Sequence, residues 1–189
     1  MGVALENRIV FILAQAISIL GLMLNCLSFQ QKKKKMLILF QFFGAILFSV
    51  HYFLIGAPLG FLMNAVGTVR GLVFAFTHPG KRGNLFRIGI FLALFLASYP
   101  FAFTLFGTEP TARNLIVEAL PVVAMCLATV SFGLPTAAGV RRITLFASPL
   151  WMTYNILNRS VGGILSELIG FCSVIIGIIR YDRREKEQK

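Results

Sequence analysis

Several polar side chains, together with the one tryptophan, stand inside long apolar stretches of this 189-residue sequence. A polar group in such a stretch is costly if lipid surrounds it, so each one is a candidate for a functional role. Amide groups can orient a small polar solute through hydrogen bonds, a carboxylate accepts further donors, and an indole ring stacks on a planar solute. We predict a solute-binding cavity formed by Asn25, His51, Asn64, Trp151, Asn155 and Glu167.

The same residues also have a structural interpretation. Asn64 and Glu167 lie on glycine-rich helix faces, where they would join neighbouring helices by hydrogen bonds. His51 either titrates or packs as a hydrogen-bonded residue near the outer interface. Arg70 either extends to the cytoplasmic interface or is a buried charge that needs a partner. Glu167 is the only acidic residue deep in a predicted helix, and its depth differs from that of Arg70 by roughly 10 Å.

The composition indicates that a lipid bilayer surrounds much of the chain. Hydrophobic residues make up 57% of the sequence, charged residues make up 13%, and the mean hydropathy is +0.81. A soluble domain has about twice that share of charged residues. The net charge of +11 does not indicate a nucleic-acid partner, because the Lys and Arg residues form short clusters between apolar runs without interleaved aromatic residues.

Seven apolar runs predict seven transmembrane helices, because helices satisfy their own backbone groups in lipid and the alternation of barrel strands is not seen. These runs cover residues 9–29, 36–55, 59–77, 88–106, 115–134, 143–157 and 161–180. With this division, fourteen Lys and Arg residues fall on one side of the membrane, against Arg8, Arg113 and Arg159 on the other. Since cytoplasmic loops collect basic residues, we expect the N-terminus outside and the C-terminus in the cytoplasm.

A shift of 103 residues places the first three helices on the last three. It aligns ten identical residues between 15–74 and 118–177, and it also aligns the helix boundaries. Two triplets in the same orientation form a parallel repeat about an axis along the membrane normal. We therefore predict an all-α integral membrane protein with a single transmembrane domain, 1–189. It would contain a first triple-helix repeat (9–77), a linker helix (88–106), a second repeat (115–180) and a cytoplasmic tail (181–189).

Short motifs resemble a known bacterial family. They are LSFQ at 27–30, HYFLIGA at 51–57, Asn64 and Arg70, and LWMTYN at 150–155. The chain resembles the YgjV family of bacterial inner-membrane proteins, a relative of the SWEET and PnuC transporters. The resemblance implies a SWEET-like arrangement of three, one and three helices in the inner membrane. The spacing of Trp151 and Asn155 is similar to a PnuC substrate motif, whereas the Pro-Gln pair of eukaryotic relatives is absent.

These observations predict a transporter or facilitator for a small polar solute that works by relative motion of the two triplets. The alternative is a membrane adaptor or receptor of the same fold that transports nothing. We expect no enzyme activity, no cofactor and no metal site, because no hydrolytic triad, zinc motif or phosphate loop occurs. Cys26, Cys126 and Cys172 are expected to be small buried hydrophobic residues. The partners are the bilayer and a small solute, and the oligomeric state, a homo-oligomer included, is left open.

Overall fold

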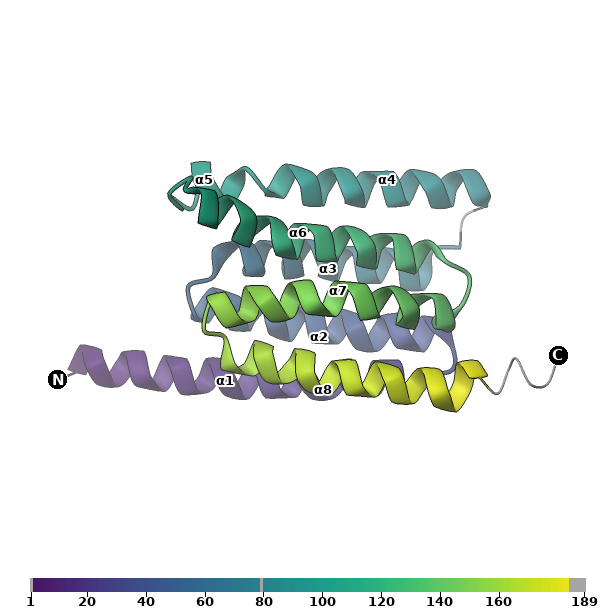
Figure 1. Ribbon diagram of the computed structural model, residues 1–189, viewed down its shortest axis with the longest axis horizontal. Helices are drawn as coiled ribbons and strands as arrows, with labels where there is room; N and C mark the ends of the chain where they lie inside the picture. The colour runs from purple at the N-terminus through teal and green to yellow at the C-terminus, as the bar shows by residue number, and fades with distance from the viewer. Residues whose placement is uncertain (1, 79, 184–189) are drawn as a thin grey trace.

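The computed structural model describes residues 2–78 and 80–183, with side chains from residue 8 to residue 182. This part of the chain forms seven long helices that run side by side, with the two termini at opposite ends (Figure 1). The long helices are α1 (Gly2–Phe29), α2 (Lys34–Leu54), α3 (Pro58–Phe76), α4 (Lys81–Ser98), α6 (Ala112–Gly133), α7 (Ala137–Leu157) and α8 (Val161–Gly177). Two short elements complete it, the four-residue helix α5 (Phe101–Thr104) and the π-helical turn η1 (Ile178–Arg183).

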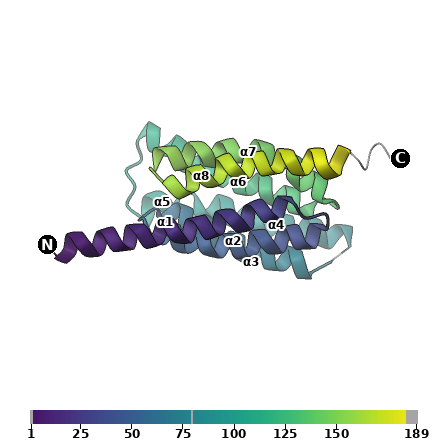
Figure 2. The same cartoon turned by 90° about the horizontal axis from the view of Figure 1, so that it is seen from below.

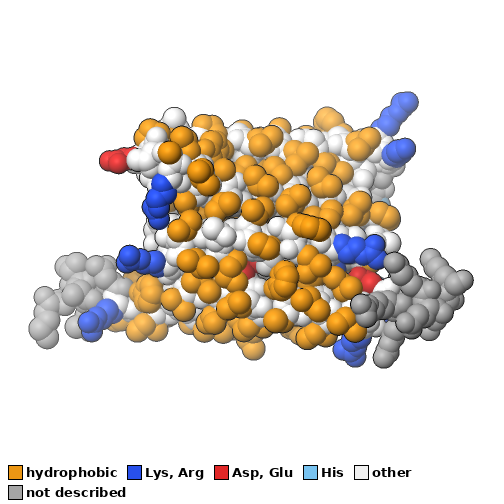
Figure 3. All heavy atoms as spheres, in the orientation of Figure 1, with side chains coloured by type: hydrophobic (Ala, Val, Ile, Leu, Met, Phe, Trp, Pro, Cys, Tyr) orange, Lys and Arg blue, Asp and Glu red, His pale blue; other side chains and the backbone are white. Residues whose placement is uncertain are grey.

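Six of these helices are long and apolar enough to cross a membrane: Arg8–Phe29, Lys34–Leu54, Pro58–Phe76, Lys81–Thr104, Ala112–Gly133 and Val161–Asp182. The sequence predicts seven, and the seventh is α7. It has 21 residues, but Arg141 and Arg142 lower its hydropathy. It still exposes apolar side chains at its surface, such as Phe146, which is 71% exposed. Figure 3 shows hydrophobic side chains spread over the middle of one face, with Lys and Arg side chains toward its two ends.

The helix limits predicted from the sequence differ most from those of the structure where polar residues extend a helix or where a proline interrupts it. The run 88–106 is two helices, because Pro100 has no N–H to donate and the chain makes a tighter turn at Tyr99, whose N–H bonds Leu96 O at 3.2 Å. The run 143–157 begins earlier, at Ala137, where the Thr136 hydroxyl accepts the Gly139 N–H and caps the helix. Of the predicted tail 181–189, residues 184–189 lie outside the described residues.

The long helices form two layers, which Figure 2 shows from the side. In one layer α2 packs between α1 and α3, and in the other α7 packs between α6 and α8. The layers meet where α1 contacts α8 and where α3 contacts α6, and α4 packs over α3 and α6. The two middle helices, α2 and α7, therefore face each other across the centre of the bundle.

The contact between α1 and α8 is close because a glycine lies where α8 begins. The Gly162 N–H, in the first turn of α8, donates to Gln15 Oε1 of α1 at 2.9 Å. A Cβ atom at Gly162 would lie 2.7 Å from the Ser18 Cβ and would overlap the Ser18 hydroxyl. A second glycine of α8, Gly170, has no neighbouring atom within 4 Å of a Cβ position, because it faces open space inside the bundle.

Gly162→Ala is expected to lower the free energy of unfolding by about 1–3 kcal/mol, because the added methyl group forces α1 and α8 apart. The measurement is the thermal unfolding midpoint of the detergent-purified protein. The matched control is Gly170→Ala in the same helix, which should leave the midpoint unchanged or slightly raised. Equal loss in both variants would contradict this account of the α1–α8 contact.

Candidate functional site

A cavity of about 140 Å³ lies between the two layers, on the axis where α2 and α7 face each other. All six helices of the two layers contribute to its wall. The polar and indole side chains that line it are Asn25, Gln41, Tyr52, Asn64, Arg70, Thr144, Ser148, Trp151, Asn155, Ser166 and Glu167. The rest of the lining is apolar, and a few polar groups in such a cavity inside a helical bundle are the setting in which a membrane protein holds a polar ligand.

Five of the six residues predicted for the site line this cavity: Asn25, Asn64, Trp151, Asn155 and Glu167. The sixth, His51, lies outside it. Its side chain is fully buried, with Nδ1 2.9 Å from Ala14 O and Nε2 2.9 Å from the Ser160 hydroxyl. His51 thus connects α2 to α1 and to the start of α8, which is the hydrogen-bonded packing role that the sequence left open.

An aromatic and amide cluster closes the cavity toward the end of the bundle where α1 begins. The Tyr52 hydroxyl donates to Asn155 Oδ1 at 2.7 Å, which joins the two middle helices directly. The Tyr52 ring stacks on Trp151, with ring centroids 5.9 Å apart and an interplanar angle of 23°. Sequence reasoning did not select Tyr52. The signal was present, because Tyr52 and Asn155 are separated by the repeat shift of 103 residues.

Glu167 places a carboxylate at the cavity wall. The Ser148 hydroxyl of α7 donates to it, so the contact joins α7 to α8 within the second layer. Within the described residues the one ion pair joins Arg141 and Asp182, and Glu167 therefore faces the cavity without a cationic partner there. A carboxylate in this position can accept hydrogen bonds from a solute or bind a cationic group.

Arg70 is a buried charge, which is the second of its two predicted roles. Its side chain does not extend to the interface, since the residue is only 6% exposed, and its partner is not Glu167, with which it forms no ion pair. Instead Nη1 donates to Met125 O and to the Thr129 hydroxyl, each at 3.0 Å, which joins α3 to α6. The guanidinium also lies 4.5 Å from the centre of the Phe132 ring, a cation–π contact.

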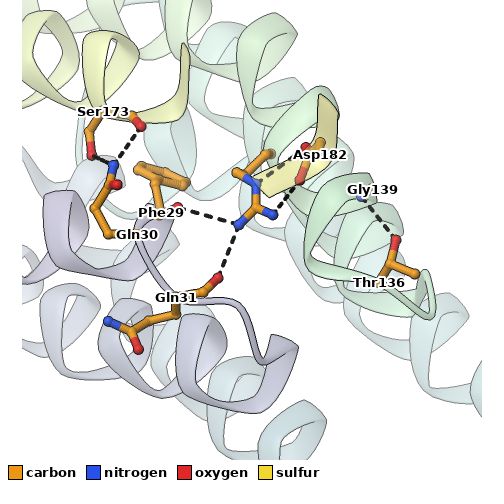
Figure 4. A network of polar contacts seen from close by, with 8 residues as sticks. Phe29, Gln30, Gln31, Thr136, Gly139, Ser173 and Asp182 are labelled. Atoms are coloured by element: carbon orange, nitrogen blue, oxygen red, sulfur yellow. Dashed lines mark hydrogen bonds and ion pairs between the residues drawn. The ribbon is translucent and has the colours of Figure 1, made fainter. Parts of the chain in front are cut away.

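Polar contacts also join the layers at the end where α1 finishes (Figure 4). Arg141 of α7 pairs with Asp182 of η1 at 2.5 Å and donates to Phe29 O at 3.3 Å and to Gln31 O at 3.0 Å. Nearby, Gln30 Nε2 donates to the carbonyl and hydroxyl oxygens of Ser173, both at 2.9 Å. The sequence analysis used Arg141 only as a marker of topology and did not identify this network, because its acceptors are mainly backbone carbonyls.

Two further features bear on the chemistry. Among residues 8–78 and 80–182, no group of three His, Cys, Asp or Glu side chains is placed to hold a metal ion. Cys26 and Cys126 are half-buried, but Cys172 is exposed, which corrects the expectation that all three are buried. Cys172 lies on the outward face of α8, between the inward-facing residues Gly170 and Ser173.

Tyr52→Phe should lower the free energy of unfolding by about 1 kcal/mol, because the substitution leaves the buried Asn155 Oδ1 without its donor. The free energy of unfolding in mixed micelles is the measurement. The control is Tyr99→Phe, which removes an exposed hydrogen bond to Leu115 O that water can replace, and should cost less. If the two variants lose the same amount, the Tyr52–Asn155 contact is not the stabilising link described here.

A comparison with known protein families supports the membrane-spanning helical architecture. No curated protein and no solved structure matches the chain at a significant level. The family model Imp-YgjV, described as a bacterial inner membrane protein, matches residues 12–185, and six helices are apolar and long enough to span a membrane. The chain therefore belongs to the Imp-YgjV family and is a multi-pass protein of the bacterial inner membrane.

Proposed function

We propose that this protein is a membrane transporter or facilitator for a small polar solute. The observation that carries the proposal is the cavity between the two layers, in which polar side chains from five of the six surrounding helices converge, while α6 contributes only Ala124, Met125 and Ala128. Polar side chains inside a membrane-spanning bundle lower its stability, and such residues commonly mark the pathway of a solute.

The arrangement of the layers supports a repeat of three helices, with α4 as the linker. The middle helix packs between the other two in each layer, and α1 meets α8 as α6 meets α3. A two-fold axis along the bundle would exchange these two contacts and would place Tyr52 on Asn155. Such a repeat would correspond to the SWEET-like arrangement of three, one and three helices that the sequence resemblance implies, and transporters with such repeats bind their solute at the repeat interface.

The cavity size limits the solute. An engineered protein cavity of about 150 Å³ is large enough for benzene, so a cavity of about 140 Å³ suits a solute of roughly six non-hydrogen atoms in this conformation. Trp151 would stack on a planar part of the solute, Asn25, Asn64 and Asn155 would exchange hydrogen bonds with it, and Glu167 would accept its donors. The Asn155 Nδ2 atom is buried without a hydrogen-bond partner among the described residues. A buried donor without an acceptor destabilises the protein, so an acceptor atom of the solute at this position would remove that destabilisation.

Alternating access requires a closure at each end of the cavity, and two sets of contacts are suited to it. The Tyr52–Asn155 hydrogen bond joins the layers at one end. The Arg141 and Gln30 contacts join them at the other. Breaking one set while keeping the other would open the cavity to one side only. Under the positive-inside rule, the excess of Lys and Arg at the second end supports a cytoplasmic position for that end.

A membrane adaptor or receptor that transports nothing is the second candidate. One observation favours it: a cavity of about 140 Å³ is below the roughly 300–1,000 Å³ of most ligand pockets. On this hypothesis the polar groups between the layers serve only to hold the helices together.

The test is the thermal stability of the detergent-purified protein across a panel of small amino acids, carboxylic acids, amides, sugars and vitamins. A ligand that binds only the folded state adds about 2.7 kcal/mol at a concentration of 100 times its Kd. We expect at least one small member to raise the midpoint, and we expect Trp151→Ala, Asn155→Ala and Glu167→Gln to remove that effect.

The matched control is Thr153→Ala, because Thr153 lies in the same helix as Trp151 but is exposed and bonds only its own helix at Pro149 O. It should retain the full ligand response. A response that survives all three cavity substitutions would show that the binding site lies elsewhere. Stabilisation by no member of the panel would favour the adaptor.

A further inference from the structure

A second pocket, of about 510 Å³, lies at the basic end of the bundle, apart from the central cavity. It is formed where α2 and α4 begin and where α3 and α6 end. Its cationic residues are Lys34, Lys35, Lys81 and Arg87, and its lining contains no Asp or Glu among the described residues. We call this site the basic pocket. Neither the family description nor the proposed transport function assigns it a role.

Arg87 is held in place on the wall of the basic pocket. Its Nη1 donates to Thr77 O at 2.7 Å and to the Thr77 hydroxyl at 2.9 Å, and its Nε and Nη2 both donate to Asn84 Oδ1. The guanidinium also stacks over Phe74, 4.1 Å from the ring centre. Every one of these partners is neutral, so the positive charge of Arg87 is fixed in position but not neutralised by the residues that hold it.

The wall around Arg87 is tied together across helices. Asn84 of α4 receives the Arg87 hydrogen bonds and donates through Nδ2 to Gly133 O, at the end of α6, at 3.0 Å. Lys34 and Lys81 are the first residues of α2 and α4. Neither of these helices has a side-chain cap or an acidic residue in its first turn, so the positive ends of both helix dipoles add to the field of the four cations.

An apolar surface adjoins the basic pocket. Lys35 lies over the ring of Phe76, with Nζ 4.8 Å from its centre, and Phe76 is 58% exposed. A ligand with a phosphate group and an acyl chain would therefore find a cationic pocket and an apolar helix surface side by side. Basic pockets between transmembrane helices on the cytoplasmic side are known sites for anionic lipid headgroups.

We propose that the basic pocket binds a phosphate group, supplied by the headgroup of an anionic phospholipid. Lys34, Lys35 and Lys81 contact the phosphate oxygens, and Arg87 forms the fixed cationic wall. The pocket volume of about 510 Å³ accommodates a glycerophosphate headgroup, which exceeds the size of a free phosphate ion. This proposal is independent of transport through the central cavity.

The experiment uses the full-length protein, purified in a neutral detergent and stripped of lipid. Binding of short-chain phosphatidylglycerol and phosphatidylcholine is measured by native mass spectrometry, with and without competing inorganic phosphate at constant ionic strength. The test variant carries Lys34→Gln, Lys35→Gln and Lys81→Gln. The matched control carries Lys32→Gln, Lys33→Gln and Arg82→Gln, which remove the same charge from the same two helix starts outside the pocket lining.

We expect the wild-type protein to prefer phosphatidylglycerol, with an affinity that falls at least about tenfold in the test variant and much less in the control. Competition by inorganic phosphate would show that the phosphate oxygens alone are recognised. Without competition, binding would need the whole lipid headgroup. Both results support the pocket. Equal losses in the two variants, or equal binding of both lipids, would overturn the proposal, because diffuse surface charge would then explain the binding.

Discussion

The hydrogen bond between Tyr52 and Asn155 joins the two layers of this bundle across their shared cavity. In hydrocarbon an unpaired polar group costs several kcal/mol, so each polar side chain must find a partner inside the protein or face a polar space. Here both solutions occur. His51 bonds neighbouring helices outside the cavity, whereas Arg70 and Ser148 bond neighbouring helices at the cavity wall. Asn25 faces the cavity itself.

The contacts between the layers are of two kinds, and this difference suits a bundle that moves. The α1–α8 contact is close and depends on glycine, with Gly162 against Ser18, so it resists separation. The contacts at the two ends of the cavity are individual hydrogen bonds, such as that from Arg141 to Gln31 O. If the layers move as proposed, each of these bonds can be exchanged for a bond to water when its end of the cavity opens.

Much of this organisation could be predicted from the sequence, because lipid imposes a simple rule on composition. The apolar runs located all seven long helices, and polar residues within them identified five cavity residues. The remaining features depend on the direction in which each side chain points in the folded bundle, which the sequence pattern does not determine. His51 has the same sequence signature as Asn25, but its ring faces Ala14 O and Ser160 instead of the cavity. The start of α7 was placed six residues too late, because hydropathy does not distinguish Arg141 inside a buried network from a loop arginine.

The most direct test of the central claim is the accessibility of a single cysteine in the cavity wall. Cys26, Cys126 and Cys172 are replaced by serine, and Ala147→Cys is introduced at a cavity position that is only 6% exposed. The control is Phe146→Cys, the preceding residue, which is 71% exposed on the outer surface of α7. Oriented membrane vesicles are treated with a charged, membrane-impermeant thiol reagent from either side. Alternating access predicts labelling of Ala147→Cys from both sides and of Phe146→Cys from neither. Labelling of Ala147→Cys from one side only, or from neither, would contradict a cavity that opens in turn to each side.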